Sequence, residues 1–217
     1  MTDPRFRLAE ALRRLNEEIA TSTADPSLSE DAAEMVEQIV ARFAAGPHER
    51  EYIAGREGSV VLPHERGFIA NSPIAGEWSP VAPPIRMRMI DNGAVGEGVF
   101  GMAYEGPPRC VHGGVVAATY DEVLGFAQGV TGMAGMTGRL LVNYRSPTPL
   151  YEQLRFTAVI DRVEGRKIFV KADCVVVGSG RLCSEAEGLF ITMRPELWAE
   201  LKAAREAERA AGEPPPA

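Results

Sequence analysis

The chain has 217 residues, of which 45% are hydrophobic and 24% charged, as in an ordinary globular protein, and its formal net charge is −7. This acidic balance argues against a nucleic-acid-binding protein, which needs a basic surface, and no apolar run approaches the ~20 residues of a membrane span. Three cysteines without CxxC spacing predict no disulfide framework. Together with the absence of a signal-peptide core in MTDPRFRLAEALRR, they favour a cytoplasmic protein.

Two amphipathic helices are predicted at the start of the chain. Residues 4–21 repeat leucine and isoleucine at helical spacing. Residues 28–45 carry a second apolar stripe, and Ser27 and Glu30 before it have the spacing of a capping box. We therefore expect residues 1–50 to form an N-terminal helical extension.

The next segment, residues 51–84, is rich in proline and glycine, as in NSPIAGEWSPVAPP. Long irregular segments of this kind are often lids or binding loops. A surface segment that merely packs against the domain is an equally good interpretation. No secondary structure is predicted for it.

Residues 85–194 are predicted to form two strands, a helix and four more strands. The strands are expected at 85–91, 95–104, 138–146, 153–163, 166–177 and 181–193, and the helix at 112–127. Short glycine turns, VEGRK and VGSGR, make the strands that they join antiparallel. One long helix with a strongly bent antiparallel sheet predicts an α+β fold in which the sheet wraps around the helix. Residues 195–217 are expected to form a C-terminal helix and a disordered tail.

The stretch VHGGVVAATYDEVLG, from Val111 to Gly125, resembles the motif of hotdog-fold acyl-CoA thioesterases of the His-Gly-Gly type. MTGRLLVNYRSPTPL and VEGRKIFVKADCVV resemble the strand and the hairpin that follow, so the resemblance covers residues 80–194. The branch that it approaches includes the thioesterase-superfamily-member and phenylacetate-pathway proteins. The resemblance implies a hotdog fold and hydrolysis of an acyl-CoA, with no metal and no other cofactor. It also implies a homodimer whose two active sites lie at the shared interface.

The start of the predicted helix offers an oxyanion site. The first N–H groups of a helix have no internal partner and lie at the positive end of its dipole. Gly113 and Gly114 leave these groups open, so a thioester carbonyl docked there would have its oxyanion stabilised. Alternatively, the two glycines only permit a tight turn into the helix. His112 either contacts the substrate or fixes this turn, and we favour the second role.

Asp121 is the predicted catalytic carboxylate. It lies among small side chains of a helix that the sequence suggests is buried, where an unpaired carboxylate is costly. We expect it to act as a general base toward water or as a nucleophile on the carbonyl carbon. Thr137 is expected to hold the water or orient Asp121. The alternatives are an aspartate that pairs elsewhere and an ordinary strand hydroxyl. Glu122 points about 100° away and is expected to make a structural or solvent contact.

Helix geometry predicts that the site is shared between two chains. The nine residues from His112 to Asp121 advance about 13.5 Å and rotate about 180°. We therefore expect Gly113 and Asp121 at different heights and on opposite sides of one helix. Two antiparallel copies of the helix would bring the carboxylate of one chain to the amide end of the other. This predicts a homodimer, or a larger homo-oligomer built from dimers.

The segment 139–181 is basic, with eight arginines and lysines against four acidic residues. A local basic patch on an acidic protein can steer an anionic ligand such as CoA. Arg145, Arg166 and Lys167 are the candidates for substrate binding, together with Gly114 at the helix start. Basic residues on strands and turns are also often simply solvated.

Other functions are compatible with parts of this pattern. A non-catalytic acyl-CoA-binding or regulatory protein on the same fold is the main alternative, although a pure binder has no need of Asp121. A hotdog hydratase resembles a different arrangement of histidine and acid, and the GxSxG motif of serine hydrolases is absent. Several His-Gly-Gly enzymes carry Asn or Gln six residues before the histidine to position water. Here that residue is Gly106, so this route is not expected.

Overall fold

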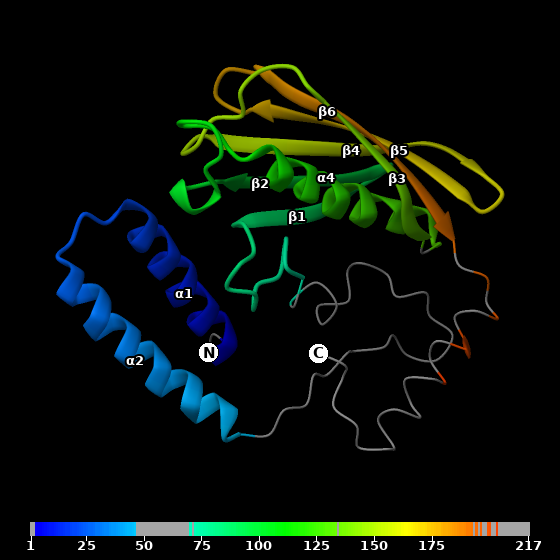
Figure 1. The fold of residues 1–217 in the computed structure, drawn as a ribbon. Helices are drawn as coiled ribbons and strands as arrows, with labels where there is room; N and C mark the ends of the chain where they lie inside the picture. The colour runs from blue at the N-terminus through cyan, green and yellow to red at the C-terminus, as the bar shows by residue number, and fades with distance from the viewer. Residues whose placement is uncertain are drawn as a thin grey trace.

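A curved antiparallel sheet covers one long helix, and a pair of N-terminal helices extends from one side (Figure 1). The computed structural model describes residues 3–46, 70, 72–133, 135–192, 194, 196, 199, 200 and 203. In chain order the elements are α1 (Pro4–Thr21), α2 (Pro26–Ala44), β1 (Ile85–Ile90), β2 (Gly93–Val99), η1 (Met102–Tyr104), α4 (Gly113–Ala127), η2 (Gln128–Thr131), β3 (Gly135–Tyr144), β4 (Gln153–Glu164), β5 (Lys167–Val176) and β6 (Leu182–Thr192). No helix within these described ranges is long and apolar enough to cross a membrane.

The six strands form one sheet in the order β1-β2-β4-β5-β6-β3. All neighbouring strands are antiparallel. The chain leaves β2 through α4 and places β3 at the far edge, where β3 pairs with the last strand, β6. The predicted α+β architecture, with a bent sheet wrapped around one helix, is confirmed.

One face of α4 fills the concave side of the sheet. Val116, Tyr120, Val123 and Ala127 recur at helical spacing and are buried. The Tyr120 ring packs edge-on against Phe156 with 5.1 Å between the ring centroids. Burial raises the pKa of the Tyr120 hydroxyl, which shares a 2.9 Å hydrogen bond with Ser184 Oγ. The helix is thereby fixed in rotation, which determines the residues that its opposite face presents.

Two local predictions are wrong at element ends. The second strand ends at Val99 and not at residue 104, because residues 102–104 close into a 3₁₀ turn. Helix α2 is capped by Asp25, whose carboxylate accepts the Ser27 N–H at 2.9 Å, and not by a Ser27–Glu30 capping box. Proline is favoured at the first helical position because it has no N–H to leave unpaired and its φ is already helical. The helix therefore begins at Pro26, two residues earlier than expected.

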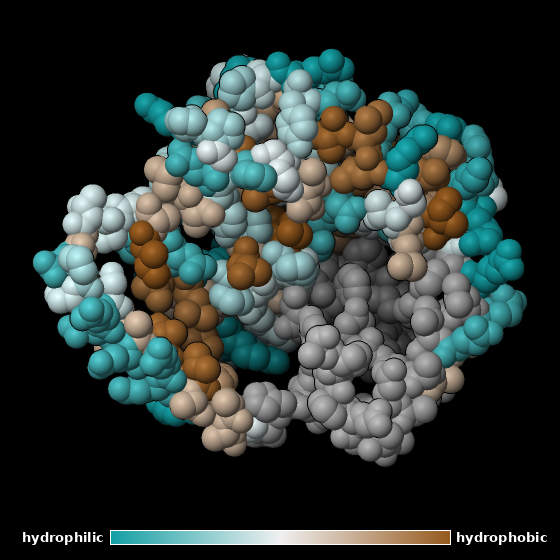
Figure 2. All heavy atoms as spheres, viewed as in Figure 1, coloured by the Kyte–Doolittle hydropathy of each residue, from teal (hydrophilic) through white to brown (hydrophobic). Residues whose placement is uncertain are grey.

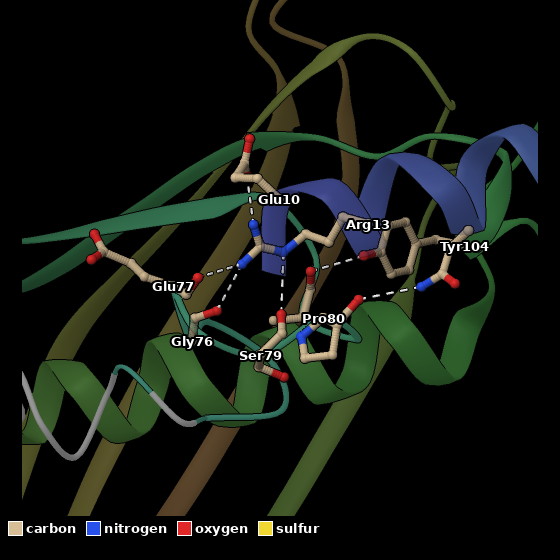
Figure 3. A network of polar contacts seen from close by, with 9 residues as sticks. Glu10, Arg13, Gly76, Glu77, Ser79, Pro80 and Tyr104 are labelled. Carbon is tan, nitrogen blue, oxygen red and sulfur yellow. Dashed lines mark hydrogen bonds and ion pairs between the residues drawn. The ribbon is translucent and has the colours of Figure 1, made fainter. Parts of the chain in front are cut away.

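All of residues 51–69 and most of the predicted C-terminal helix and tail, 195–217, lie outside the described residues. The described part of the proline-rich segment, residues 72–84, is tied to α1 by Arg13 (Figure 3). The guanidinium donates to the carbonyl oxygens of Ser79, Gly76 and Glu77 at 3.2, 3.1 and 2.8 Å. One planar, five-donor group therefore satisfies three loop carbonyls and holds this segment against the extension.

Glu17 of α1 holds the chain that leads into α4. Its carboxylate accepts the backbone N–H groups of Met102 and Ala103 at 2.8 and 3.0 Å. It also accepts the hydroxyl of Tyr151 at 2.6 Å. Partial burial raises the pKa of Glu17, but the three hydrogen bonds outweigh this and leave the pKa below its ordinary value. The extension therefore stabilises the 3₁₀ turn directly.

We expect Glu17→Gln to lower the free energy of unfolding by about 1–3 kcal/mol, because an amide cannot satisfy all three donors as a carboxylate does. A depressed folded-state pKa means that the charged form contributes stability above the ordinary glutamate value of 4.5. That contribution is lost as the pH falls through the lower, folded-state value. Urea unfolding at pH 7 and at pH 3.5 measures both effects. Glu18→Gln, on the exposed side of the same turn, is the control. Equal losses in the two variants would contradict the role given to Glu17.

Candidate active site

The imidazole of His112 caps α4. Its Nδ1 accepts the N–H of Gly114 at 3.0 Å. The carbonyl of His112 accepts the N–H groups of Val115 and Val116 at 2.9 and 3.1 Å. Among the described residues, Gly113 N–H is left as the amide of the first turn without a hydrogen-bond partner. The structure thus narrows the predicted pair of glycine donors to Gly113, because Gly114 already bonds within its own chain.

The position of His112 is itself fixed from two sides. Its backbone N–H donates to the carbonyl of Tyr104 at 2.9 Å. A Cβ at Gly106 would lie 2.7 Å from the Cα of His112, so no side chain fits there in this backbone. This explains why the residue six positions before the histidine is glycine. The capping geometry supports an orienting role for His112 and does not itself place the side chain on a substrate.

Tyr144, at the end of β3, also reaches the helix start and is a residue that the sequence analysis missed. Its hydroxyl donates to the carbonyl of Gly113 at 2.6 Å. The ring is 54% exposed and borders the open amide. A tyrosine at the end of a strand is an ordinary feature, so only the register of β3 against α4 could have identified it.

Asp121 and Thr137 meet farther along the contact between α4 and β3. The Thr137 hydroxyl donates to Asp121 Oδ1 at 2.7 Å, which is the orienting contact that the sequence analysis predicted. Both side chains are exposed in the single chain. The expectation that Asp121 lies on a buried part of the helix is therefore wrong, because the sheet buries the opposite face of α4.

The adjacent side chain of Glu122 points away from the Asp121–Thr137 pair and toward Ser72. Burial raises its pKa, the negative charge of Asp121 adds to this rise, and a hydrogen bond with Ser72 opposes it. Glu122 therefore contacts the segment that covers the helix. The structural contact expected for this side chain is found.

Gly113 and Asp121 lie on the same side of α4, and not on opposite sides as expected. Eight residues separate them, which corresponds to a rotation of about 80° and an advance of about 12 Å. Both contact β3, Gly113 through Tyr144 and Asp121 through Thr137. The axial separation remains, so the amide and carboxylate of one chain are too far apart to act on one carbonyl carbon.

The basic candidates do not form one cluster in a single chain. Arg145 follows Tyr144 at the Gly113 end of β3 and forms a 2.7 Å ion pair with Glu185. Arg166 and Lys167 lie at the other end of the sheet, where the Arg166 Nε donates to the Thr192 carbonyl at 2.9 Å. A surface hollow there is lined by the side chains of Arg166, Arg194, Glu196 and Glu200.

Comparison with known proteins identifies the family to which this chain belongs. No protein-family model matches the chain. A crystal structure of a thioesterase superfamily protein superposes with a TM-score of 0.73 at 30% identity, covering 88% of this chain and 92% of that one.

Two curated relatives carry the same description, acyl-coenzyme A thioesterase THEM4. The protein from Bos taurus is 39% identical over 92 residues, or 42% of this chain and 38% of that protein. The protein from Mus musculus is 34% identical over 96 residues, or 44% of this chain and 41% of that protein. The matched region of this chain thus spans about two fifths of the length of each curated relative. The superposition over nearly the full length of both chains, at this identity, establishes that the chain belongs to the thioesterase superfamily and has its hotdog fold.

Proposed function

We propose that the protein is an acyl-CoA thioesterase, which converts an acyl-CoA and water into the free acid and CoA. The observation that carries the proposal is Gly113 N–H at the start of α4, which has no hydrogen-bond partner among the described residues and lies on the side of the helix that also carries Asp121. An unpaired N–H at the positive end of a helix stabilises negative charge as it develops on a carbonyl oxygen. The family to which the chain belongs agrees with this reaction.

In the proposed reaction, Asp121 acts at the thioester carbonyl and Gly113 N–H binds the oxygen. As a general base, Asp121 takes a proton from water while the water oxygen bonds to the carbonyl carbon. The tetrahedral intermediate then expels the CoA thiolate, which receives the proton from Asp121. As a nucleophile, the carboxylate instead attacks the carbonyl carbon and expels the CoA thiolate, which leaves a mixed anhydride of Asp121 with the acyl group. Water then hydrolyses the anhydride to the free acid and the Asp121 carboxylate, and the proton released goes to the thiolate. Thr137 orients the carboxylate in either case through Oδ1.

We propose that the active unit is a homodimer in which Gly113 of one chain and Asp121 of the other act on one thioester. Their separation of about 12 Å along one helix requires a second chain, and two antiparallel helices supply each site with one of each group. The edge strand β3, which contacts both residues, presents Met136 at 63% and Leu141 at 49% exposure. An open edge with exposed apolar side chains favours pairing with another chain.

The proposed dimer also gives the basic residues a common place. Arg145 and the Arg166–Lys167 turn lie at opposite ends of the sheet in one chain. Antiparallel packing of two chains would bring Arg145 of one chain to the same end as Arg166 and Lys167 of the other. We propose that the phosphates of CoA bind at this end, mainly to Arg166 and Lys167. The positive charge of Arg145 is already paired with the carboxylate of Glu185.

The compartment we propose is the cytoplasm. Cys110, Cys174 and Cys183 are free thiols in the structure, and Cys174 and Cys183 are buried near each other in the core. Thiols persist in a reducing environment, which is the environment that the cytoplasm maintains.

Asp121→Asn should lower turnover by roughly 10²–10⁴, the usual loss when a general base is removed. The asparagine can still accept the Thr137 hydroxyl, so the local geometry should be kept. Release of free thiol from a panel of acyl-CoA thioesters measures the effect, and circular dichroism checks the fold. Glu122→Gln is the matched control, because that side chain faces Ser72, and it should retain activity. Wild-type turnover in Asp121→Asn would exclude the proposed role.

Mixed dimers test whether the site is shared. Gly113→Val places methyl groups beside the Tyr144 hydroxyl, which is 3.4 Å from a Cβ at this position, and so obstructs the amide. Gly113→Val and Asp121→Asn should each be inactive alone. Co-refolding them should restore up to about half of the wild-type activity per heterodimer, since one of its two sites then has both intact groups. If verified heterodimers remain inactive, the two groups act within one chain.

The double variant Arg166→Ala with Lys167→Ala should raise KM for a long acyl-CoA more than for a short thioester without a nucleotide, because only the first substrate has phosphates to bind. Arg145→Ala should have the smaller effect. Lys171→Ala, on β5 like Lys167, removes a surface ion pair with Asp161 of β4 and controls for loss of positive charge. An equal effect on both substrates would show that Arg166 and Lys167 act on the fold.

A further inference from the structure

Helix α2 carries a continuous apolar face that the described part of the chain does not cover. None of its 19 residues is buried. The large apolar residues of this face, which we call the α2 stripe, are Leu28, Met35, Val36, Ile39, Val40 and Phe43, exposed at 56, 57, 39, 46, 60 and 60%. Figure 2 shows hydrophobic side chains gathered along the N-terminal helices at the edge of the molecule.

An uncovered stripe of this kind needs a partner. Isolated helices of this length are marginally stable in water, and most helical stability in proteins comes from packing an apolar face. The remaining face of α2 carries Glu30, Asp31, Glu34 and Glu37 against Arg42 alone. An acidic face of this composition is repelled by anionic lipid and by nucleic acid, because binding to either surface relies on lysine and arginine. The partner is therefore a protein surface.

The α2 stripe is nearly symmetric when it is read in reverse. About a midpoint between Met35 and Val36, Leu28 corresponds to Phe43, and Ala32 corresponds to Ile39. A two-fold interface brings the same patch of both subunits together, so that residue i of one contacts residue j of the other and the reverse. An antiparallel pair of α2 helices satisfies this relation over about four turns. Large residues meet at both ends and at the centre, Ile39 packs on Ala32, and Val40 lies opposite Asp31.

The charges select the same arrangement. Asp31 and Arg42 are eleven residues apart, so they lie within about 20° of each other along one edge of the stripe, at opposite ends of the helix. Antiparallel pairing brings Arg42 of one copy to Asp31 of the other, twice in each pair. Parallel pairing would instead place the two Arg42 side chains at the same height on opposite sides of the contact, with Asp31 beside neither, and would align the two helix dipoles unfavourably.

We propose that α2 is an association helix whose stripe packs antiparallel against α2 of a second copy of this chain. This helix contact is separate from the proposed active-site residues on α4 and β3. It does not depend on the thioesterase activity proposed above. It gives the N-terminal extension a role in assembly, in addition to its contacts with the 3₁₀ turn.

Disulfide trapping in the full-length chain tests the proposal. In a Cys110→Ser background, which removes the partly exposed native thiol, Met35→Cys lies beside the two-fold axis and should cross-link to its own copy. Mild oxidation should shift the band from 23.4 kDa to twice that mass. Glu34→Cys, on the acidic face of the same turn, is the matched control and should stay monomeric. Both substitutions are on exposed positions, so circular dichroism should show an intact fold.

The direction of pairing is tested at the helix ends. In an antiparallel pair, Leu28→Cys alone is about 22 Å from its own copy and should not cross-link, whereas a mixture of Leu28→Cys and Phe43→Cys chains should. Arg42→Asp should reduce the cross-linking of Met35→Cys, and adding Asp31→Arg should restore it. Equal cross-linking of Met35→Cys and Glu34→Cys, or none in either, would overturn self-association through the stripe. Cross-linking of Leu28→Cys alone would overturn the antiparallel arrangement.

Discussion

The packing of α4 against the concave side of the sheet determines the rest of the site. Tyr120, Val123 and Ala127 bury one side of this helix, and Gly113, Ala117 and Asp121, at four-residue spacing, form a row that turns from the edge of this buried face toward the exposed side. Small residues on that side leave the amide and the carboxylate accessible. Because the core fixes the rotation of the helix, the reactive groups need no flexible loop to position them.

Strand β3 contacts the helix at both of these functional points. Tyr144 reaches the carbonyl of Gly113, and Thr137 reaches the carboxylate of Asp121. An edge strand is usually the least constrained strand of a sheet. Here two side-chain hydrogen bonds to α4 add to the ladder with β6, so the strand at the proposed dimer contact is also the strand that orients the proposed catalytic residues.

Much of the fold could be predicted from the sequence, because local patterns encode it. Alternating strands, glycine turns and the apolar periodicity of the helices predicted its elements to within a few residues. Contacts between distant segments could not be predicted in this way. The hydrogen bond of Tyr144 depends on a register between β3 and α4, and the exposure of Asp121 depends on which side of the helix the sheet covers. The Asp121–Thr137 pair was predictable only because its spacing resembles a family motif. The hydrogen bonds of Glu17 to the N–H groups of residues 102 and 103 have no local sequence pattern that predicts them.

The order of the strands has a consequence for how the protein is made. Strand β3 leaves the ribosome early, but its partner in the sheet is β6, at residues 182–192. A nascent chain that ends before residue 182 therefore holds β3 without its ladder, and the β3 side chains that pack against the core, Leu140 and Val142, lose part of their cover. Pairings between distant segments form late because they require closure of long loops. The contact between α4 and β3 is thus supported by its sheet neighbour only after residue 192 has been synthesised, and a product truncated before β6 presents an unpaired strand.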